Sequence, residues 1–312
     1  MYSVVIPTYN RLPMLLRVLE ALDRQVDAPE FEVVVVNDGS KDATAETLAR
    51  LELESGFCYP LIQRTQKNAG PGRARNFGVE LSSGEFVVFI GDDTVPERRF
   101  LAEHHRVHAM HDDDPWVACL GYTGWPAEEP VTAFMDYIND YGLQFGYKLI
   151  EHDTIVPFNF FYTSNISISR EVLIAHPFDT SFPAAAWEDI ELAYRLDQLG
   201  LEIHYNADAV TRHHHPTTVA SFARRQYTVG RSGAIFLQMH PELRHFLGVE
   251  ELREKGAGTN GRIAWLTLVA KAGETFRMLA RPKAFEQLMR LHYLRGLSAG
   301  IEEHGDPLEK SG

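Results

Sequence analysis

The sequence predicts an α/β protein with a mostly parallel sheet flanked by helices and a helical C-terminal extension. Apolar runs alternate with segments of helical periodicity through the first 125 residues. The apolar runs are continuous, which is typical of parallel strands buried on both faces. Beyond residue 260 the pattern is helical almost to Glu303. We therefore expect an α/β domain over residues 1–240 and a helical extension over residues 241–312.

The first half is expected to contain five short strands separated by helices. The strands cover residues 3–7, 31–37, 59–63, 85–90 and 117–122. Leucines at helical spacing predict a helix over residues 12–23. A second helix begins after Ser40 or Asp42, either of which can cap it, and a third covers residues 72–81.

The second half is less regular. Residues 126–162 are rich in aromatics without clear periodicity, and we expect them to cover the edge of the sheet. The pattern then predicts a strand at 164–169, a helix at 188–199, short extended pieces at 202–205 and 209–215, and a helix at 219–237.

Composition and charge narrow the class of protein. The formal net charge of −13 disfavours bulk nucleic-acid binding, which normally needs a basic face. The two cysteines, Cys58 and Cys119, lack a disulfide or zinc pattern and are expected to be buried free thiols in a reducing cytoplasm. We see no signal-peptide pattern and no apolar run long enough to span a membrane, so any membrane contact is expected to be peripheral.

Polar side chains follow three of the predicted strands at their carboxyl ends. Thr8 to Asn10 follow the first strand, Asp38 follows the second, and Asp92 with Asp93 follows the fourth. In open parallel sheets, ligands bind beyond these strand ends. The convergence of three strands on one edge predicts a binding site there.

The pair Asp92 and Asp93 is the first candidate for metal binding. Two adjacent carboxylates repel each other, and a hard cation such as Mn²⁺ or Mg²⁺ with substrate phosphates relieves that repulsion. Gly-Asp-Asp-Thr is also good turn chemistry, which is the alternative interpretation. His213 could complete the metal shell; in an extended strand, His213 and His215 share one face and His214 faces away.

Other candidates fit a nucleotide. Asp38 can accept a base N–H or cap a helix, and Tyr9 beside Pro7 can stack on the base or pack in the core. Asn68 and Arg75 lie in a glycine-containing segment at a helix start, where anions bind well. Arg75 could approach a diphosphate, brace Asp38 or lie on a solvated helix face.

Glu188 and Asp189 lie in the first turn of a predicted helix, where the helix dipole favours carboxylates. That dipole accounts for both residues without any function. The functional alternative is that one of them is a general base toward an acceptor hydroxyl.

Eight motifs occur in an order that resembles the family 2 glycosyltransferases of the GT-A fold, over about residues 2–236. They are IPTYN, VVVVNDGS, NAGPGRARNFG, GDDTVP, SNISISREVL, FDTSF, WEDIELAYRL and HHHPTT. The resemblance implies a nucleotide-diphospho-sugar donor and inversion at the anomeric carbon. It implies nucleotide contacts by Tyr9 and Asp38, a metal on Asp93 with Asp92 near the ribose and diphosphate, and Asp189 as catalytic base. Gly91 stands where many members carry an acid, so this chain lacks a full Asp-x-Asp.

The resemblance and the residues together predict a metal-dependent glycosyltransferase that acts by single displacement, with UDP as the expected nucleotide. The acceptor is a saccharide or another hydroxyl compound, with Trp125, Trp187 and Glu188 as candidate contacts. The rival interpretations are a sugar nucleotidyltransferase and a non-catalytic binding or scaffold subunit. A nucleotidyltransferase would be expected to carry a glycine-rich, Arg-containing loop after the first strand, where this chain has PTYNRLP.

The helical extension is locally basic. Between residues 256 and 300 there are seven Lys or Arg and two Asp or Glu. Basic amphipathic helices suit an anionic membrane surface. The alternatives are a helical cap packed on the enzyme or on a second subunit, as in a homo-oligomer.

Overall fold

The computed structural model describes residues 1–142, 144–183 and 186–307, and the chain divides into two compact units. Unit 1 comprises Met1–Glu129, Ile150–Thr180 and Glu188–His215. Unit 2 comprises Pro130–Leu149, Ser181–Trp187 and Pro216–Gly312. The predicted boundary after residue 240 falls inside unit 2, and the assignment of functions to domains stays a prediction.

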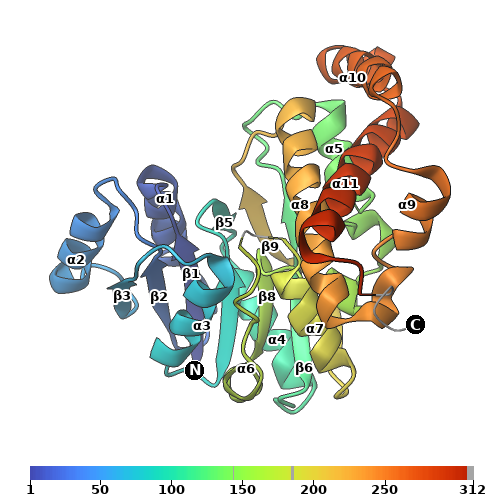
Figure 1. The fold of residues 1–312 in the computed structure, drawn as a ribbon. Coiled ribbons are helices and arrows are strands. Elements are labelled where there is room, and N and C mark those ends of the chain that lie inside the picture. Colours follow the sequence, from blue (N-terminus) through green and yellow to red (C-terminus); the bar gives the residue numbers. More distant parts are fainter. Residues whose placement is uncertain (143, 184–185, 308–312) are drawn as a thin grey trace. The chain divides into compact units, whose positions relative to one another are not determined.

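Unit 1 holds a sheet of nine strands within the described residues. Its strands are β1 (Tyr2–Thr8), β2 (Phe31–Asn37), β3 (Leu61–Thr65), β4 (Phe86–Ile90), β5 (Thr94–Pro96), β6 (Val117–Gly124), β7 (Thr154–Val156), β8 (Asn165–Ser169) and β9 (Glu202–His213). The order is β3-β2-β1-β4-β8-β6-β9-β5, and β7 also pairs with β9. Figure 1 shows β3, β2 and β1 side by side in blue at the left of the view.

The parallel core of the sheet is β3, β2, β1 and β4. The side chains of β2 and β4 are buried along their whole length, as their continuous apolar sequence predicts. β8 runs antiparallel between β4 and β6, whereas β6 and β9 are parallel. The predicted strands are confirmed with small shifts, and the two extended pieces predicted at 202–205 and 209–215 form the single strand β9. Cys119 of β6 is a buried free thiol as predicted, whereas Cys58, in the loop before β3, is exposed.

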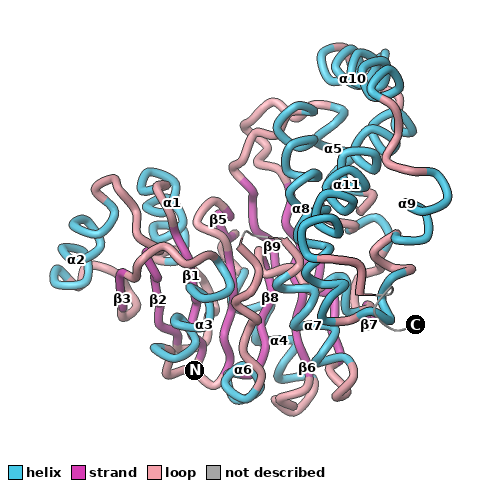
Figure 2. Tube along the Cα trace, in the orientation of Figure 1, coloured by secondary structure: helices cyan, strands magenta, loops and turns pink. Residues whose placement is uncertain are grey.

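Helices cover the sheet of unit 1 and connect its strands (Figure 2). They are α1 (Leu12–Leu22), α2 (Thr44–Glu54), α3 (Pro71–Leu81), α4 (Phe100–Met110), α6 (Arg170–Ala175) and α7 (Glu188–Asp197), with the short 3-10 helix η2 (Phe158–Phe160). α1 buries Leu15, Leu19 and Leu22, the face that the leucine spacing predicts. These leucines join the core formed by β1, β2 and β4.

A bulge interrupts the pairing of β6 with β9. Gly121 pairs with Asn206 but Tyr122 pairs with Val210, so β9 carries extra residues there. Asn165, at the start of β8, closes the bulge: its Nδ2 donates to the carbonyl oxygens of Tyr122 (3.0 Å) and Ala209 (2.8 Å). The bulge sets the register of the rest of β9, which ends at His213.

Buried polar side chains of α4 and β8 form hydrogen bonds that hold the Asn165 side chain in place. His104 Nε2 lies 2.9 Å from Asn165 Oδ1, and His104 Nδ1 lies 2.8 Å from Ser167 Oγ. His108 Nε2 lies 2.7 Å from the same Ser167 hydroxyl. Burial lowers the pKa of His104 to about 4 and that of His108 to about 3, so both imidazoles are neutral.

Unit 2 is helical in its described residues. It contains α5 (Ala133–Asp140), η1 (Tyr147–Leu149), α8 (Val219–Met239), η3 (Pro241–Arg244), α9 (Val249–Lys255), α10 (Asn260–Thr275), η4 (Arg277–Leu279) and α11 (Pro282–His304). Figure 2 shows α8 and α11 lying side by side. Among the described helices, none is both long and apolar enough to cross a membrane.

Glycines allow α8 and α11 to approach closely. A Cβ at Gly296 of α11 would lie 1.9 Å from the Tyr227 carbonyl oxygen of α8. A Cβ at Gly230 of α8 would lie 2.0 Å from the Tyr293 carbonyl oxygen of α11. The two backbones therefore meet at a distance that excludes any side chain at these positions.

Candidate active site

The acidic pair lies just beyond the end of β4, and both carboxylates are buried. Thr8, the last residue of β1, donates its hydroxyl to Asp92 Oδ2 at 2.7 Å. The Arg11 guanidinium donates to Asp92 Oδ1 at 3.1 Å and also to Asp93 Oδ2. One cation therefore bridges the two like charges that the sequence identified, and the predicted meeting of the β1 and β4 ends is present.

Two histidines from the end of β9 face Asp93. His213 Nε2 lies 3.6 Å and His215 Nδ1 3.5 Å from Asp93 Oδ2. His214 points elsewhere, with its Nδ1 2.7 Å from Glu129 Oε1. The predicted alternation of the three histidines is thus present. Thr94 of β5 pairs with His213, so the short strand after Asp93 fixes this alignment.

Asp93, His213 and His215 form a group that could hold a metal ion, because their ligand atoms all lie within 4.8 Å of one another. A carboxylate oxygen with two imidazole nitrogens is a donor set that suits a first-row divalent metal. The residues present therefore fit the predicted metal. The sequence left open which of His213 and His215 is the ligand, and the geometry brings both to Asp93.

The surrounding groups shift the pKa values of the Asp92 and Asp93 carboxylates in opposite directions. Burial and the charge of Asp93 raise the pKa of Asp92 above its usual range, against the opposing effect of Arg11. Burial also acts to raise the pKa of Asp93, but the adjacent His213 and His215 imidazoles, together with Arg11, hold it well below its usual range. Asp93 is therefore the carboxylate that stays ionised, as a metal ligand must.

Trp125 and Gly91 shape the space beside the triad. The Trp125 ring stacks on the His213 ring at 5.5 Å between centroids, with the planes 15° apart. A Cβ at Gly91 would lie 2.9 Å from Asp93 Oδ1. The departure from Asp-x-Asp at Gly91 thus leaves Asp93 room, and Trp125, predicted as an acceptor contact, lies against a candidate metal ligand.

Asp38 organises the loop before α3. Its carboxylate accepts from Gln66 Nε2 at 2.7 Å and from the backbone N–H groups of Ala69 and Gly70 at 2.9 and 3.0 Å. Asn68 Nδ2 donates to the Asp38 carbonyl oxygen at 3.0 Å. The structure thus brings together Asp38 and Asn68, and it gives Asp38 a clear structural task in addition to its predicted contact with a base.

Arg75 lies away from Asp38 and pairs with Glu188. Its Nη1 lies 2.7 Å from Glu188 Oε1, and both side chains are buried. Among the described residues, Nε of Arg75 and Oε2 of Glu188 have no hydrogen-bond partner. This buried ion pair contradicts two of the predicted settings for Arg75, a contact with Asp38 and a solvated helix face. The predicted approach of Arg75 to a diphosphate stays a prediction.

Asp189 follows Glu188 at the start of α7. Burial and the adjacent Glu188 charge raise the pKa of Asp189 to about 6, and Arg75 opposes that shift. The Thr163 hydroxyl and the Ile190 N–H point to its carboxylate, at 3.4 and 2.9 Å. A carboxylate with a pKa near neutrality is suited to general base catalysis.

Three further residues were predicted for the site, namely Pro7, Tyr9 and Trp187. Pro7 is within β1, and Tyr9, directly after it, is 42% exposed and so accessible for stacking. Trp187 belongs to unit 2, where its indole N–H donates to the Val229 carbonyl oxygen at 2.8 Å. Trp187 has a φ of 75°, a strained conformation for an aromatic residue, directly before Glu188.

The prediction missed Arg11 and Glu129. Arg11 precedes α1 and has no periodic or motif signal other than a positive charge after IPTYN. Glu129 lies in a segment without recognisable periodicity. Only the folded chain brings them to Asp93 and to His214.

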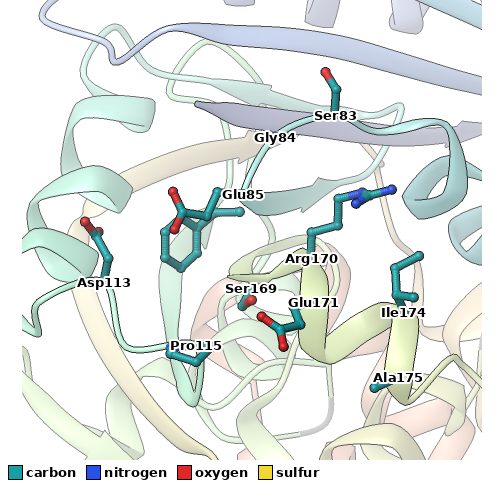
Figure 3. Close-up of a pocket in the computed structure, with 11 residues that line it drawn as sticks. Ser83, Gly84, Glu85, Asp113, Pro115, Ser169, Arg170, Glu171, Ile174 and Ala175 are labelled. Atoms are coloured by element: carbon teal, nitrogen blue, oxygen red, sulfur yellow. The ribbon is translucent and has the colours of Figure 1, made fainter.

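A separate pocket of about 590 Å³ lies at the opposite end of the sheet (Figure 3). It includes Glu85 and Phe86 at the start of β4, and Ser169 at the end of the antiparallel β8, with Arg170 and Asp113 at its wall. Asp92 and Asp93 follow the other end of β4. The pocket is therefore distinct from the site built by the predicted residues.

Comparison with known sequences identifies relatives over much of the chain. The sequence model for glycosyl transferase family 2 matches residues 3–173. Validoxylamine A glucosyltransferase of Streptomyces hygroscopicus subsp. limoneus is 29% identical over 269 residues, covering 77% of this chain and 57% of that protein. Chondroitin synthase of Escherichia coli is 26% identical over 243 residues, covering 69% of this chain and 34% of that protein. This chain thus spans less than two thirds of either relative.

Solved structures share the fold. A mannosyltransferase from Pyrobaculum calidifontis, in complex with GDP-Man and Mn²⁺, aligns with a TM-score of 0.63 at 21% identity over 97% of this chain and 87% of that one. Staphylococcus aureus TarS residues 1–349, in complex with UDP, aligns with a TM-score of 0.55 at 18% identity over 97% and 90%. These alignments confirm the predicted GT-A fold and its helical C-terminal region.

Proposed function

Because the chain belongs to glycosyl transferase family 2, we propose that it is a glycosyltransferase that moves a sugar from a nucleotide-diphospho-sugar to an acceptor hydroxyl. The observation that carries this proposal is the group Asp93, His213 and His215 at the carboxyl edge of the sheet. In this position a divalent cation would meet a donor diphosphate bound beyond the strand ends.

The residues take separate roles. Asp93, His213 and His215 would hold Mn²⁺ or Mg²⁺, and the bound cation would neutralise charge that develops on the nucleoside diphosphate leaving group. Asp92, with Thr8 and Arg11, lies on the donor side of this group. Asp38 and Asn68 hold the loop beside which the base binds, and Pro7 and Tyr9 form its other edge, with UDP as the expected nucleotide.

Asp189 removes the proton from the acceptor hydroxyl as that oxygen attacks the anomeric carbon. The attack proceeds by single displacement, so the new bond has the opposite anomeric configuration. Arg75 and Glu188 fix the start of α7 through their buried ion pair. The unpartnered Glu188 Oε2 supports the predicted contact of Glu188 with an acceptor hydroxyl, because a buried acceptor without a donor is costly.

Calorimetry with UDP, GDP and dTDP, each with Mn²⁺ and then with a chelator, tests the donor site. We expect UDP to bind most tightly and to lose most of its affinity in chelator. Equal affinity with and without metal would contradict the metal assignment.

Proton NMR of the product made from an α-linked donor tests inversion: a β-linkage is expected, and an α-linkage would show retention. Donor binding with neither transfer nor slow donor hydrolysis would favour the non-catalytic alternative.

A further inference from the structure

One segment of unit 2, from α10 to the end of η4, carries five exposed apolar side chains. We call this set the α10 surface, and it consists of Trp265, Leu268, Phe276, Met278 and Leu279. Their exposed fractions range from 44% for Leu279 to 87% for Met278. Isolated exposed apolar residues are ordinary, whereas several on one short segment indicate a contact site.

α10 has a second, buried face that accounts for its folding. Ile263, Leu266 and Ala270 are buried, and α10 packs against α11 and α5 within unit 2. Trp265 and Leu268 therefore contribute little to the packing of unit 2. Their replacement by polar residues is expected to leave the fold intact.

The segment that carries the α10 surface is rich in cations. Between residues 260 and 283 there are five Lys or Arg and one Asp or Glu, a difference of +4, in a chain of net charge −13. Arg277 pairs with Asp136 at 2.5 Å, and Glu274 accepts the Val219 N–H at 2.7 Å. The other four cations form no ion pair with any described residue; they are Arg262, Lys271, Arg281 and Lys283.

We propose that the α10 surface docks on an anionic lipid bilayer. Exposed tryptophan, leucine and methionine side chains suit the boundary between headgroups and acyl chains, and the cations of the same segment suit anionic headgroups. The negative charge of the rest of the chain is repelled by the same membrane, so only this surface is directed toward it.

Charge also favours a membrane over a second copy of the chain. A two-fold interface centred on this surface would bring the same four unpaired cations of both copies together. Like charges desolvated against each other destabilise such a contact, whereas anionic lipid headgroups neutralise them.

Vesicle flotation tests the proposal without any sugar donor, so its result is independent of the proposed transfer. The probes are phosphatidylcholine vesicles with and without phosphatidylglycerol at roughly one third of the lipid. We expect the protein to float with the anionic vesicles only and to be released by high salt. No binding to anionic vesicles would overturn the proposal.

Variants locate the surface. Leu268→Asp combined with Met278→Asp should weaken binding on the order of tenfold or more, because both lose apolar burial. Lys271→Gln combined with Arg281→Gln should weaken it about 25-fold, at about fivefold for each lost cation. Leu53→Asp, on the 85%-exposed Leu53 of α2, is the matched control and should bind as wild type. Unchanged binding by both double variants would refute the assignment to α10.

Light scattering distinguishes docking on a membrane from contact with a second copy of the chain. A dimer that Leu268→Asp converts to a monomer, together with no vesicle binding, would show that the surface contacts a second copy instead. A wild-type monomer that binds anionic vesicles supports the proposal.

Discussion

Single side chains determine the charge state of the candidate active site. Arg11 lies between Asp92 and Asp93, and His213 and His215 complete the surroundings of Asp93. A guanidinium and a divalent cation would compete for the same Asp93 oxygen. Arg11 therefore stabilises the acidic pair when no metal is bound and is expected to lower the affinity of the site for a metal ion.

Replacing Arg11 by Gln should expose this competition. Without metal, Arg11→Gln should lower the melting temperature, because the two buried carboxylates lose their shared cation. With Mn²⁺, the variant should gain more in melting temperature than wild type does. Arg24→Gln, a change of an exposed arginine on the surface, is the control. An equal Mn²⁺ response in Arg11→Gln and wild type would contradict the competition.

Asp189→Asn tests the proposed base. The change keeps the shape and removes the basicity, so transfer should fall by roughly 10²- to 10⁴-fold while donor and metal affinity change little. Glu188→Gln should lower transfer less. A near wild-type rate in Asp189→Asn, measured by product formation, would exclude the role; loss of nucleotide binding would place Asp189 in the donor site.

The pKa of Asp189 sets an expected pH dependence. A base acts when deprotonated, and burial with the Glu188 charge raises this pKa to about 6. The rate of transfer should therefore rise with pH through about 6 and fall toward lower pH. An acid limb near pH 4, the ordinary aspartate range, would show that the environment does not perturb this group.

At the residue scale the sequence singled out carboxylates and histidines at strand and helix ends, where local rules apply. The pair Asp92 and Asp93 and the alternation of His213 and His215 came from such positions, whereas only the family resemblance distinguished Asp189 from Glu188. The catalytic and binding roles of these residues stay predictions. Arg11 and the partner of Arg75 were not identifiable in the sequence, because each depends on segments far apart in the chain: Arg75 and Glu188 are separated by more than a hundred positions.

At the scale of secondary-structure elements, the backbones of two pairs of elements approach each other closely. One close approach is the crossing of α8 and α11 at Gly230 and Gly296, and the other is the bulge of β9 beside Gly121. A Cβ at Gly121 would lie 2.3 Å from the Ala209 carbonyl oxygen. The sequence predicted these helices and strands from periodicity, but periodicity contains no information on backbone separation.

Gly296→Ala should destabilise the protein. The added methyl group meets the Tyr227 carbonyl oxygen, and overpacking of this kind costs about 1–3 kcal/mol or more. Gly261→Ala in α10 is the matched control, because its Cβ would meet no atom within 4 Å, and it should stabilise by up to about 1 kcal/mol. Urea denaturation measures both; a neutral Gly296→Ala would contradict the close crossing.

Asn165→Ala should weaken metal binding from a distance. Removal of the amide leaves the Tyr122 and Ala209 carbonyl oxygens of the bulge without this donor, costing about 1–3 kcal/mol of stability. The bulge sets the register of His213, so Mn²⁺ affinity should also fall. Thr65→Ala, in the distant β3, is the control for Mn²⁺ affinity. Lower stability with unchanged Mn²⁺ affinity would limit Asn165 to a structural role.

For the whole molecule, the sequence predicted an α/β region followed by helices, and the comparisons confirm the fold. The predicted boundary at residue 240 follows the predicted helix at 219–237. That helix, α8 in the structure, packs on α11 within unit 2. A sequence pattern shows where an element ends, but not which later element covers it.

A fragment of residues 1–240 should therefore fold poorly. It retains α8 but lacks α11, so the face of α8 that packs on α11 would be left uncovered. We expect it to aggregate or to elute as a broad distribution in size-exclusion chromatography. A monodisperse, cooperatively melting fragment would show instead that residue 240 is a true domain boundary.

The amide of Asn165 also fixes hydrogen positions as far away as α4. Carbonyl oxygens only accept, so the Asn165 Nδ2 must face the bulge and its Oδ1 must accept from His104 Nε2. Neutral His104 then has a bare Nδ1, which takes the Ser167 proton, and the hydroxyl oxygen in turn accepts from His108 Nε2. All hydrogen bonds of this series therefore donate in one direction, from His108 toward Asn165. Both imidazoles are Nε2–H tautomers, which ¹⁵N chemical shifts would report. The bulge of β9 thereby determines the tautomer of His108 through the intervening side chains of Asn165, His104 and Ser167.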